Sequence, residues 1–428
     1  MNFLYHFNQF LWSGPVIFLL LGLHIYFTFH LGFVQKHIGK GIRFSLSDSS
    51  SERSSHDHRF SAFGSLTTTL AATLGTGNIV GISTAVYLGG PGAVFWCWIT
   101  GLLGMATTYA ETYLSAKYQT GPIRILNNHL KKKFFALLYS LALCLSAFCI
   151  GCTTQSNAIT DSLNQVFQIP PAISAIATAF LVGLILIQGR HWIEKFSMAV
   201  VPTMAMFFLG GCVLYLILHH SYVPAALSTI VKEAFGVAPI AGGLTGFTMK
   251  EALRYGVARG LFTNEAGLGT AGIIAGNCDE KKPQQQGLVS MSASFWDTVV
   301  LCAVTGIMLV AYQIEYVGTW NLYSPGSLCA AAFSALPFWG DEILAVAIFS
   351  FALATLVGWS YLGMEGFSFL FKKGQIIYLT FYLIMIFVGG ILPLTLVWEL
   401  TDCINLLLLI PSVYLLVKCR REIRPPKN

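Results

Sequence analysis

The fold of this chain is decided by two short stretches, Leu74-Gly75-Thr76-Gly77-Asn78-Ile79 and Leu268-Gly269-Thr270-Ala271-Gly272-Ile273, which share the pattern Leu-Gly-Thr-x-x-Ile. Each interrupts a long apolar segment. Paired glycines at membrane depth weaken a helix and free backbone amides and carbonyls, which is tolerated only where a ligand, an ion or a neighbouring helix pairs with them. Close helix packing explains either stretch alone equally well. The matched pair favours a binding site built from two broken helices.

The composition around these stretches is that of a membrane protein. Of the 428 residues, 55% are hydrophobic and only 10% are charged, which excludes an ordinary soluble domain. A helix that crosses the hydrocarbon needs about 20 mostly apolar residues. This rule predicts an all-α polytopic protein with about eleven spans, at 12–34, 64–88, 91–116, 134–160, 170–189, 197–219, 250–278, 287–312, 342–371, 375–393 and 395–417.

The basic residues predict the orientation of these spans. All but four of the 25 Lys and Arg residues fall in alternate loops, and the positive-inside rule places those loops in the cytoplasm. We therefore expect an integral protein of the cell membrane with its N-terminus outside and its C-terminus in the cytoplasm. The net charge of +6 then reflects topology and requires no nucleic-acid partner.

The four exceptions are Lys232, Lys250, Arg254 and Arg259, which lie near the start of the seventh segment. The sequence leaves three readings open for 222–260: an external amphipathic helix, a re-entrant piece, or a misplaced span boundary.

The two interruptions lie five spans apart, which predicts an internal repeat. An odd number of spans per repeat makes the halves inverted, as in secondary transporters whose half-helix N-termini face an anionic substrate group while freed carbonyls hold a cation. The predicted units are an extra helix and linker, two five-helix repeats and a basic tail, at 1–60, 61–219, 220–418 and 419–428. We expect no enzyme, because the spans carry no nucleophile or metal motif, and a channel is disfavoured because no repeated pore loop occurs.

At these residues the sequence resembles the alanine or glycine:cation symporter family, also called sodium:alanine symporters. The matching blocks follow the family's order over about residues 12–418. They are Gly75-Thr76-Gly77-Asn78-Ile79, Gly89-Gly90-Pro91-Gly92-Ala93-Val94-Phe95-Trp96, Gln155-Ser156-Asn157, Ala258-Arg259-Gly260-Leu261-Phe262-Thr263-Asn264-Glu265-Ala266-Gly267-Leu268-Gly269-Thr270, Gln286-Gly287, Asp297-Thr298, and Gly358-Trp359-Ser360-Tyr361 with Gly363 and Glu365.

The resemblance implies a five-plus-five core of the leucine-transporter type behind one extra helix, and sodium-coupled uptake of alanine or glycine. By similarity, the substrate pocket and the adjoining ion sites fall at Asn78, Gln155, Thr270, Ile274, Thr355 and Trp359. The sequence shows Thr263, Thr270, Gly272 and Ala275 where family members usually carry Ser, Ser, Pro and His. These departures leave the preference among glycine, L-alanine and D-alanine open, and a proton-coupled symporter or a carrier of another small solute remains the alternative.

A zwitterionic substrate in a dry midplane needs partners for both of its charges. We expect the freed amides of Gly75, Thr76 and Gly77, with Gly269, to take the carboxylate. The side-chain oxygens of Asn78, Gln155 or Thr270 would meet the ammonium, and Trp359 and Ile274 would limit the side chain to a methyl or less. The backbone carbonyls of Thr73 and Leu74 with the hydroxyl of Thr355 would hold sodium, the coupling ion, and no other cofactor is expected.

Four acidic residues also fall within or beside the spans, where ionisable groups are costly. The sequence suggests that Glu265 pairs with Arg259 and that Asp297 caps a helix or holds a gate. It suggests that Glu111 and Asp402 reach the membrane interface. None of the four is assigned to ion coupling.

Overall fold

The structure is a computed structural model that describes residues 14–47, 59–236, 248–278, 282–318, 323–392 and 394–426, without side chains over 394–403. The described residues are helical, and their one strand-like pairing is an isolated bridge between Phe60 and Cys278. All eleven predicted segments contain helix.

The long and medium helices, in chain order, are α2 Pro15–His30, α3 Ile38–Ser47, α4 Ala62–Thr73, α5 Val80–Gly89, α6 Gly92–Tyr118, α8 Lys133–Phe148, α9 Thr154–Phe167, α10 Pro171–Ile187, α11 Arg190–Leu218, α12 Val223–Ala234, α13 Met249–Asn264, α15 Pro283–Ser294, α16 Ala303–Glu315, α18 Gly340–Leu370, α19 Gln375–Gly389 and α20 Leu394–Cys419. Shorter α-helices are α7 Pro122–Arg124, α14 Thr270–Ala275 and α17 Leu328–Ser334. Short 3₁₀ turns are η1 Val34–His37, η3 Thr76–Asn78, η6 His220–Tyr222 and η9 Arg420–Glu422, and π-helical turns are η4 Ile125–His129, η5 Cys149–Thr153 and η7 Phe295–Cys302.

Within the described residues, five helices are long and apolar enough to cross a membrane unaided, and up to seven if each of two bent pairs forms one span. The bends are 65° between α2 and the η1–α3 segment, and 62° between α4 and the η3–α5 segment. The apolar helices α10 and α19 are shorter, with 17 and 15 residues. The predicted seventh segment is divided into α13 and α14.

The structure describes two helices in the stretch that contains the four basic exceptions, α12 and, after it, α13. A separate amphipathic helix, α12, buries Ala226, Ile230 and Ala234 while Lys232 is exposed. The next span begins at α13, where the Thr248 hydroxyl accepts from the Glu251 amide and the Glu251 carboxylate accepts from the Thr248 amide. The stretch therefore contains a separate amphipathic helix, and the predicted span boundary at residue 250 agrees with the start of α13 to one residue.

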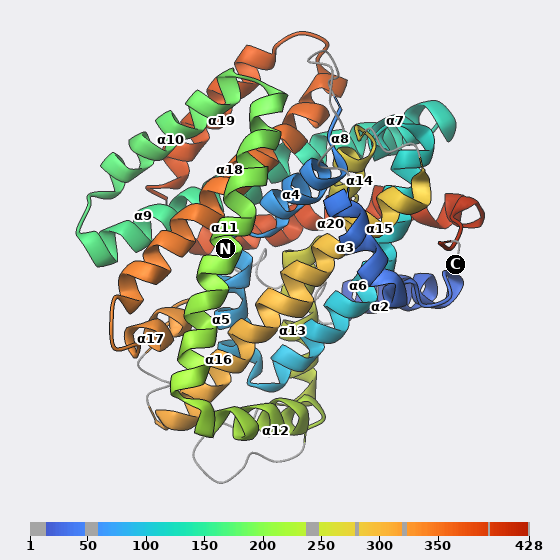
Figure 1. The fold of residues 1–428 in the computed structure, drawn as a ribbon. Helices are drawn as coiled ribbons and strands as arrows, with labels where there is room; N and C mark the ends of the chain where they lie inside the picture. Colours follow the sequence, from blue (N-terminus) through green and yellow to red (C-terminus); the bar gives the residue numbers. More distant parts are fainter. Residues whose placement is uncertain are drawn as a thin grey trace.

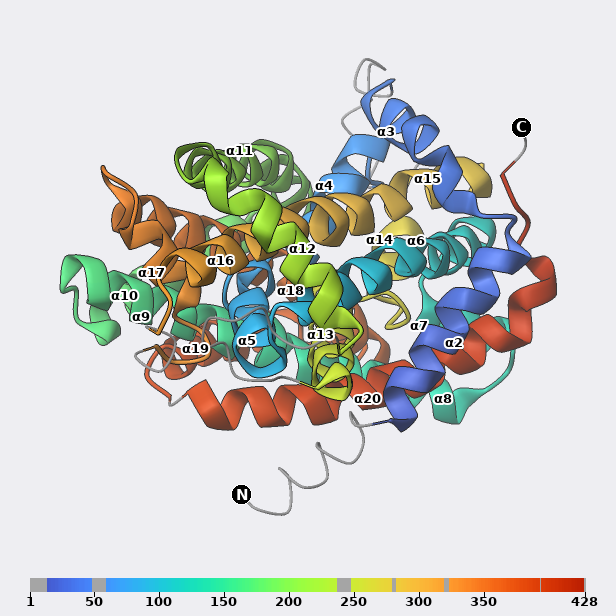
Figure 2. The same ribbon diagram turned by 90° about the horizontal axis from the view of Figure 1, so that it is seen from below.

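The helices form a bundle around α18, which passes through the middle of the molecule (Figure 1). Helix α18 packs against α4, α8, α9 and α11, so the first broken segment lies beside it. A second group, α6, α13 and α15, packs together on the other side of the break. Helices α2 and α20 cross at the periphery of the bundle, as the view from below shows (Figure 2).

Candidate functional site

The first break lies in a gap that only glycine fits. Helix α4 ends at Thr73, η3 follows, and α5 resumes in a new direction. A Cβ atom on Gly75 would lie 2.8 Å from Thr355 Oγ1 and 3.1 Å from Gln155 Oε1. The missing side chain at position 75 therefore lets the broken backbone sit between α9 and α18.

Neutral oxygens gather at this break. The Thr355 hydroxyl lies 3.3 Å from the Leu74 carbonyl and 3.0 Å from the Phe351 carbonyl. The Thr73 carbonyl accepts from the Gly75 amide at 2.9 Å. The structure thus brings together Thr73, Leu74 and Thr355, the three residues predicted to hold sodium. It places no group of three or more His, Cys, Asp or Glu side chains that could hold a metal among the described residues.

Gln155 joins α9 to the same break. Its Oε1 accepts from the Thr76 amide at 3.2 Å, and its Nε2 donates to the Ile150 carbonyl at 3.2 Å. Two of the amides predicted to take a substrate carboxylate thus already have partners in this structure, Thr76 with Gln155 and Gly75 with Thr73. The third predicted residue, Gly77, faces Phe262 of α13.

Asn78 is fully buried and is held by η7. Its Nδ2 donates to the Asp297 carbonyl at 3.1 Å and to Asp297 Oδ1 at 2.8 Å, and it lies 3.3 Å from Cys302 Sγ. Its Oδ1 is buried without a hydrogen-bond partner among the described residues. Asn78 therefore offers an acceptor, and this connection to Asp297 was not part of the sequence prediction.

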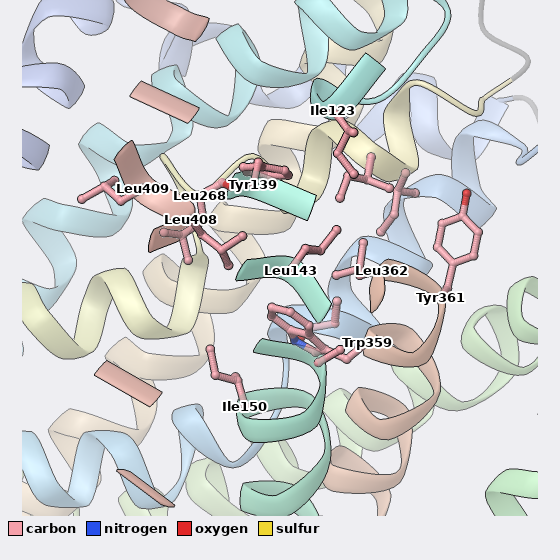
Figure 3. Packing of buried hydrophobic residues seen from close by; sticks show 14 of the residues in the cluster. Ile123, Tyr139, Leu143, Ile150, Leu268, Trp359, Tyr361, Leu362, Leu408 and Leu409 are labelled. Atoms are coloured by element: carbon pink, nitrogen blue, oxygen red, sulfur yellow. Dashed lines mark hydrogen bonds between the residues drawn. The ribbon is translucent and has the colours of Figure 1, made fainter. Parts of the chain in front are cut away.

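Trp359 is fully buried on α18 beside Ile150 and Leu143 (Figure 3). Its indole Nε1 donates to the Ala72 carbonyl at 3.2 Å, just before the first break. A Cβ atom on Gly151 would lie 2.2 Å from Trp359 Cβ, so the two helices touch closely there. The indole therefore contacts the last turn of α4, next to the first break.

The second break has its own polar contacts. Gly269 has a φ of +81°, and a Cβ atom there would lie 2.7 Å from the Tyr139 hydroxyl oxygen. The Gly269 amide donates to Glu111 Oε1 at 2.9 Å, so a substrate carboxylate would have to displace Glu111. The Thr270 hydroxyl donates to Glu265 Oε2 at 2.6 Å.

Helix α14, which starts at Thr270 and contains the fully buried Ile274, packs against α4 and α18. At the other broken segment, Gly77 of η3 lies against Phe262 and Thr263 near the end of α13. The two broken segments are therefore linked by the packing of η3 against α13 and of α14 against α4.

The sequence interpretation of the acidic residues needs one correction. Glu111 does not reach the interface, because its side chain is buried and accepts from the Gly269 amide and from the Ser412 hydroxyl. The Glu111 carboxylate accepts a hydrogen bond from the backbone of the second broken helix. The sequence of α6 could not predict this role, because the two partners lie 158 and 301 residues away along the chain. The side chain of Asp402 lies outside the described residues.

A cavity of about 780 Å³ leads to the first break. Its wall includes the exposed Asp161 and Asp341 and the buried Thr76, so it runs from a polar entrance to the site. Asn157 and Arg259 also line it. The volume lies within the usual range for small-molecule sites, about 300–1,000 Å³.

The other end of α18 is closed by a cluster that we call the seal, made of Phe60, Arg190, Asn277 and Tyr361. The Arg190 guanidinium lies 4.2 Å from the centre of the Phe60 ring and 5.0 Å from that of Tyr361. Arg190 also donates to the Asn277 carbonyl at 3.3 Å, and Asn277 Nδ2 donates to the Tyr361 hydroxyl at 3.0 Å. Among the described residues the site is thus reached by the cavity on one side and covered on the other.

The fold agrees with that of a solved amino-acid complex. The crystal structure of MhsT in complex with L-phenylalanine superposes with a TM-score of 0.63 at 13% identity, covering 85% of this chain and 89% of that one. At this identity the likeness shows the fold alone, which is the leucine-transporter type.

Sequence comparison identifies the family. The family model described as the sodium:alanine symporter family matches residues 1–423. The chain is 36% identical to the sodium/alanine symporter AgcS of Methanococcus maripaludis, over 95% of this chain and 92% of that one. It is 32% identical to the probable sodium/glutamine symporter GlnT of Bacillus subtilis, over 92% of this chain and 83% of that one. The chain is therefore a helical membrane transporter that belongs to the sodium:alanine symporter family.

Proposed function

We propose that the protein takes up a small neutral amino acid, alanine or glycine, into the cell together with sodium by alternating access. The observation that carries this proposal is the oxygen group at the first break, where Thr355 Oγ1 and the Leu74 carbonyl lie 3.3 Å apart beside Gly75. Two oxygens at this spacing suit neighbouring ligands of one hard cation with bonds of about 2.3–2.6 Å.

The substrate would complete the same site. Its carboxylate would take the amides of Gly75, Thr76 and Gly77, displacing Gln155 from the Thr76 amide. Its ammonium would meet the oxygens of Asn78 and Gln155. Because the ion and the substrate share one neutral pocket, each raises the affinity of the other by the same factor.

Trp359 and Ile274 would form the apolar wall that limits the substrate side chain. Both are fully buried next to a break. A pocket wall discriminates one extra methylene by about 1–3 kcal/mol. We therefore expect larger amino acids to be rejected in a graded way.

The direction of transport follows from the predicted topology. With the basic loops in the cytoplasm, the cavity would open to the outside and the seal would close the cytoplasmic side, which is the arrangement that accepts external substrate. The proposed inverted repeats, 61–219 and 220–418, each contribute one broken helix to the site.

The test is uptake of labelled glycine, L-alanine and D-alanine into proteoliposomes, with an inward sodium gradient and with sodium replaced by potassium. We expect sodium to drive accumulation of at least one of them. Uptake that follows an imposed pH gradient without sodium would instead favour proton coupling, for which Glu111, Glu265 and Asp297 provide buried carboxyl groups. No uptake of any of the three would refute the substrate assignment.

A further inference from the structure

The amide of Asn78 is held in one orientation by η7. Its Nδ2 faces three acceptors, the Asp297 carbonyl, Asp297 Oδ1 and Cys302 Sγ. An NH₂ group is a donor and a main-chain carbonyl is an acceptor only, so the reverse orientation would set the Asn78 oxygen against the Asp297 carbonyl. The Oδ1 of Asn78 must therefore point away from Asp297.

The π-helical form of η7 makes this contact possible. Asp297 and Cys302 are five residues apart, and the i to i+5 pattern of a π-helix places them on one side of the turn. In a regular α-helix the same spacing would rotate them by about 140°. Both then meet Asn78.

Asp297 is itself held by its neighbour. The Thr298 hydroxyl donates to Asp297 Oδ2 at 2.7 Å. Thr298 in turn packs against α6, where a Cβ atom on Gly101 would lie 2.5 Å from its Cγ2. Both carboxylate oxygens of Asp297 thus accept a hydrogen bond, and the group has little freedom to turn.

The second site amide shows the same arrangement. Gln155 is the second residue of α9, just after η5, and its Nε2 donates to the Ile150 carbonyl inside that π-turn. Its Oε1 then faces the first break. Each of the two site amides therefore donates to a π-turn, Asn78 to η7 and Gln155 to η5.

We propose that Asp297 is a positioning residue that fixes Asn78 as an acceptor for the cationic group in the site. That group is either the ammonium of the amino acid or the sodium ion. The inference rests on the proposed function, since Asn78 is taken there as a site residue. It assigns Asp297 a role in affinity that requires no contact with the substrate.

The test compares variants of the full chain in proteoliposomes. Asp297→Asn keeps the size of the side chain but introduces an NH₂ group that allows the Asn78 amide to turn over. We expect either the KM for alanine or the half-saturating sodium concentration to rise about tenfold, with little change in the maximal rate. This is the size expected for loss of a charge-assisted hydrogen bond. Thr298→Val is the milder control, because the bond to Asn78 remains and only the support of Asp297 is lost.

Two measurements distinguish the two cations. A rise in the KM for alanine at saturating sodium identifies the ammonium as the partner of Asn78. A rise in the half-saturating sodium concentration at saturating alanine identifies the ion. If both constants of Asp297→Asn stay within about twofold of the parent while Asn78→Ala abolishes uptake, the positioning role is refuted.

The exchanged pair, Asn78→Asp with Asp297→Asn, keeps the net charge and reverses the donor and the acceptor. An oxygen at position 78 still faces the site, so we expect this variant to recover part of the lost affinity. Failure to recover any affinity in a folded protein would count against the proposal. The sodium-induced rise in melting temperature provides a readout that needs no transport. If the parent takes up none of the three amino acids, the proposed function fails. The positioning role is refuted separately if the rise in melting temperature with sodium alone and the further rise with sodium plus alanine are both unchanged in Asp297→Asn.

Discussion

At the scale of single residues, the site depends on close approach. Gly75 lies between Thr355 and Gln155, and the Leu74 carbonyl beside it faces the Thr355 hydroxyl. None of these groups is charged. Small displacements of the backbone therefore decide whether oxygens can surround an ion.

Gly75→Ala should abolish sodium-driven alanine uptake, because its methyl group would lie 2.8 Å from Thr355 Oγ1. The matched control is Gly81→Ala on the adjoining helix α5, where a Cβ atom meets nothing within 4 Å. Labelled alanine uptake checks both. Normal uptake by Gly75→Ala would show that the oxygens at this break do not hold the ion.

Trp359→Phe should weaken discrimination against larger amino acids. The variant keeps a ring against Gly151 but loses the donor to the Ala72 carbonyl. It is preferable to Trp359→Ala, since deleting a buried Trp costs about 3–5 kcal/mol. The measurement is competition of 2-aminobutyrate and leucine against labelled alanine. An unchanged competition profile would mean that Trp359 only packs.

The residues of the first break were predictable from sequence, because paired glycines in an apolar segment are a local signal. The partners of those residues were not. Asp297 lies 219 residues from Asn78, and the π-turn that directs it has no distinct composition. Glu111 was misplaced for the same reason, since its partner is an amide on another helix.

At the scale of elements, the proposed transport cycle depends on the two broken helices and on the seal. The two broken segments were located correctly from their glycines, and the predicted start of the seventh segment lies within one residue of the start of α13. The occupancy of the freed amides was not predictable. It depends on Gln155 and Glu111, which approach from α9 and α6.

Arg190→Ala should open the seal. The cation–π contacts of a desolvated guanidinium contribute up to about 2 kcal/mol, so opening should become roughly tenfold more frequent. Cys278, which is buried beside Phe60, reports this directly. The measurement is its labelling by an impermeant maleimide in inside-out vesicles.

Arg190→Lys is the matched variant, since lysine keeps the charge but lacks the planar group that lies between the two rings. We expect an intermediate labelling rate for it. Adding Cys278→Ser to the Arg190→Ala variant shows how much of the maleimide labelling occurs at Cys278. Equal labelling of the parent and Arg190→Ala would show that the seal is held by other contacts.

At the scale of the whole molecule, the spans and their order were predictable because the bilayer sets helix length. The packing of the tail was not predictable from its basic composition. Glu422 binds back to the end of α6, with its Oε2 2.5 Å from Lys117 Nζ and 2.5 Å from the Tyr118 hydroxyl. The end of the chain is thus fastened to the core.

This contact should depend on pH. Burial alone would raise the pKa of Glu422, but hydrogen bonds from Lys117 and Tyr118 outweigh it and lower the pKa. A lowered carboxyl pKa contributes stability above the ordinary value that is lost as the pH falls through the lowered one. Glu422→Gln should therefore lower the melting temperature slightly at pH 7, because a partly exposed pair contributes less than about 1 kcal/mol to the free energy of unfolding. The difference from the parent should vanish in acid, and a difference that persists there would contradict the ion pair.

Helix α18 carries a residue of the cavity entrance, Asp341, the proposed sodium ligand Thr355 and a residue of the seal, Tyr361. At about 1.5 Å per residue, the entrance lies roughly 20 Å from Thr355 along this rod. A relative tilt of about 10° between α18 and the packed α4, pivoting near Thr355, would move that end by about 3–4 Å and swing the opposite end the other way. With the pivot at the proposed ion site, such a tilt would widen one mouth of the pathway while it narrows the other.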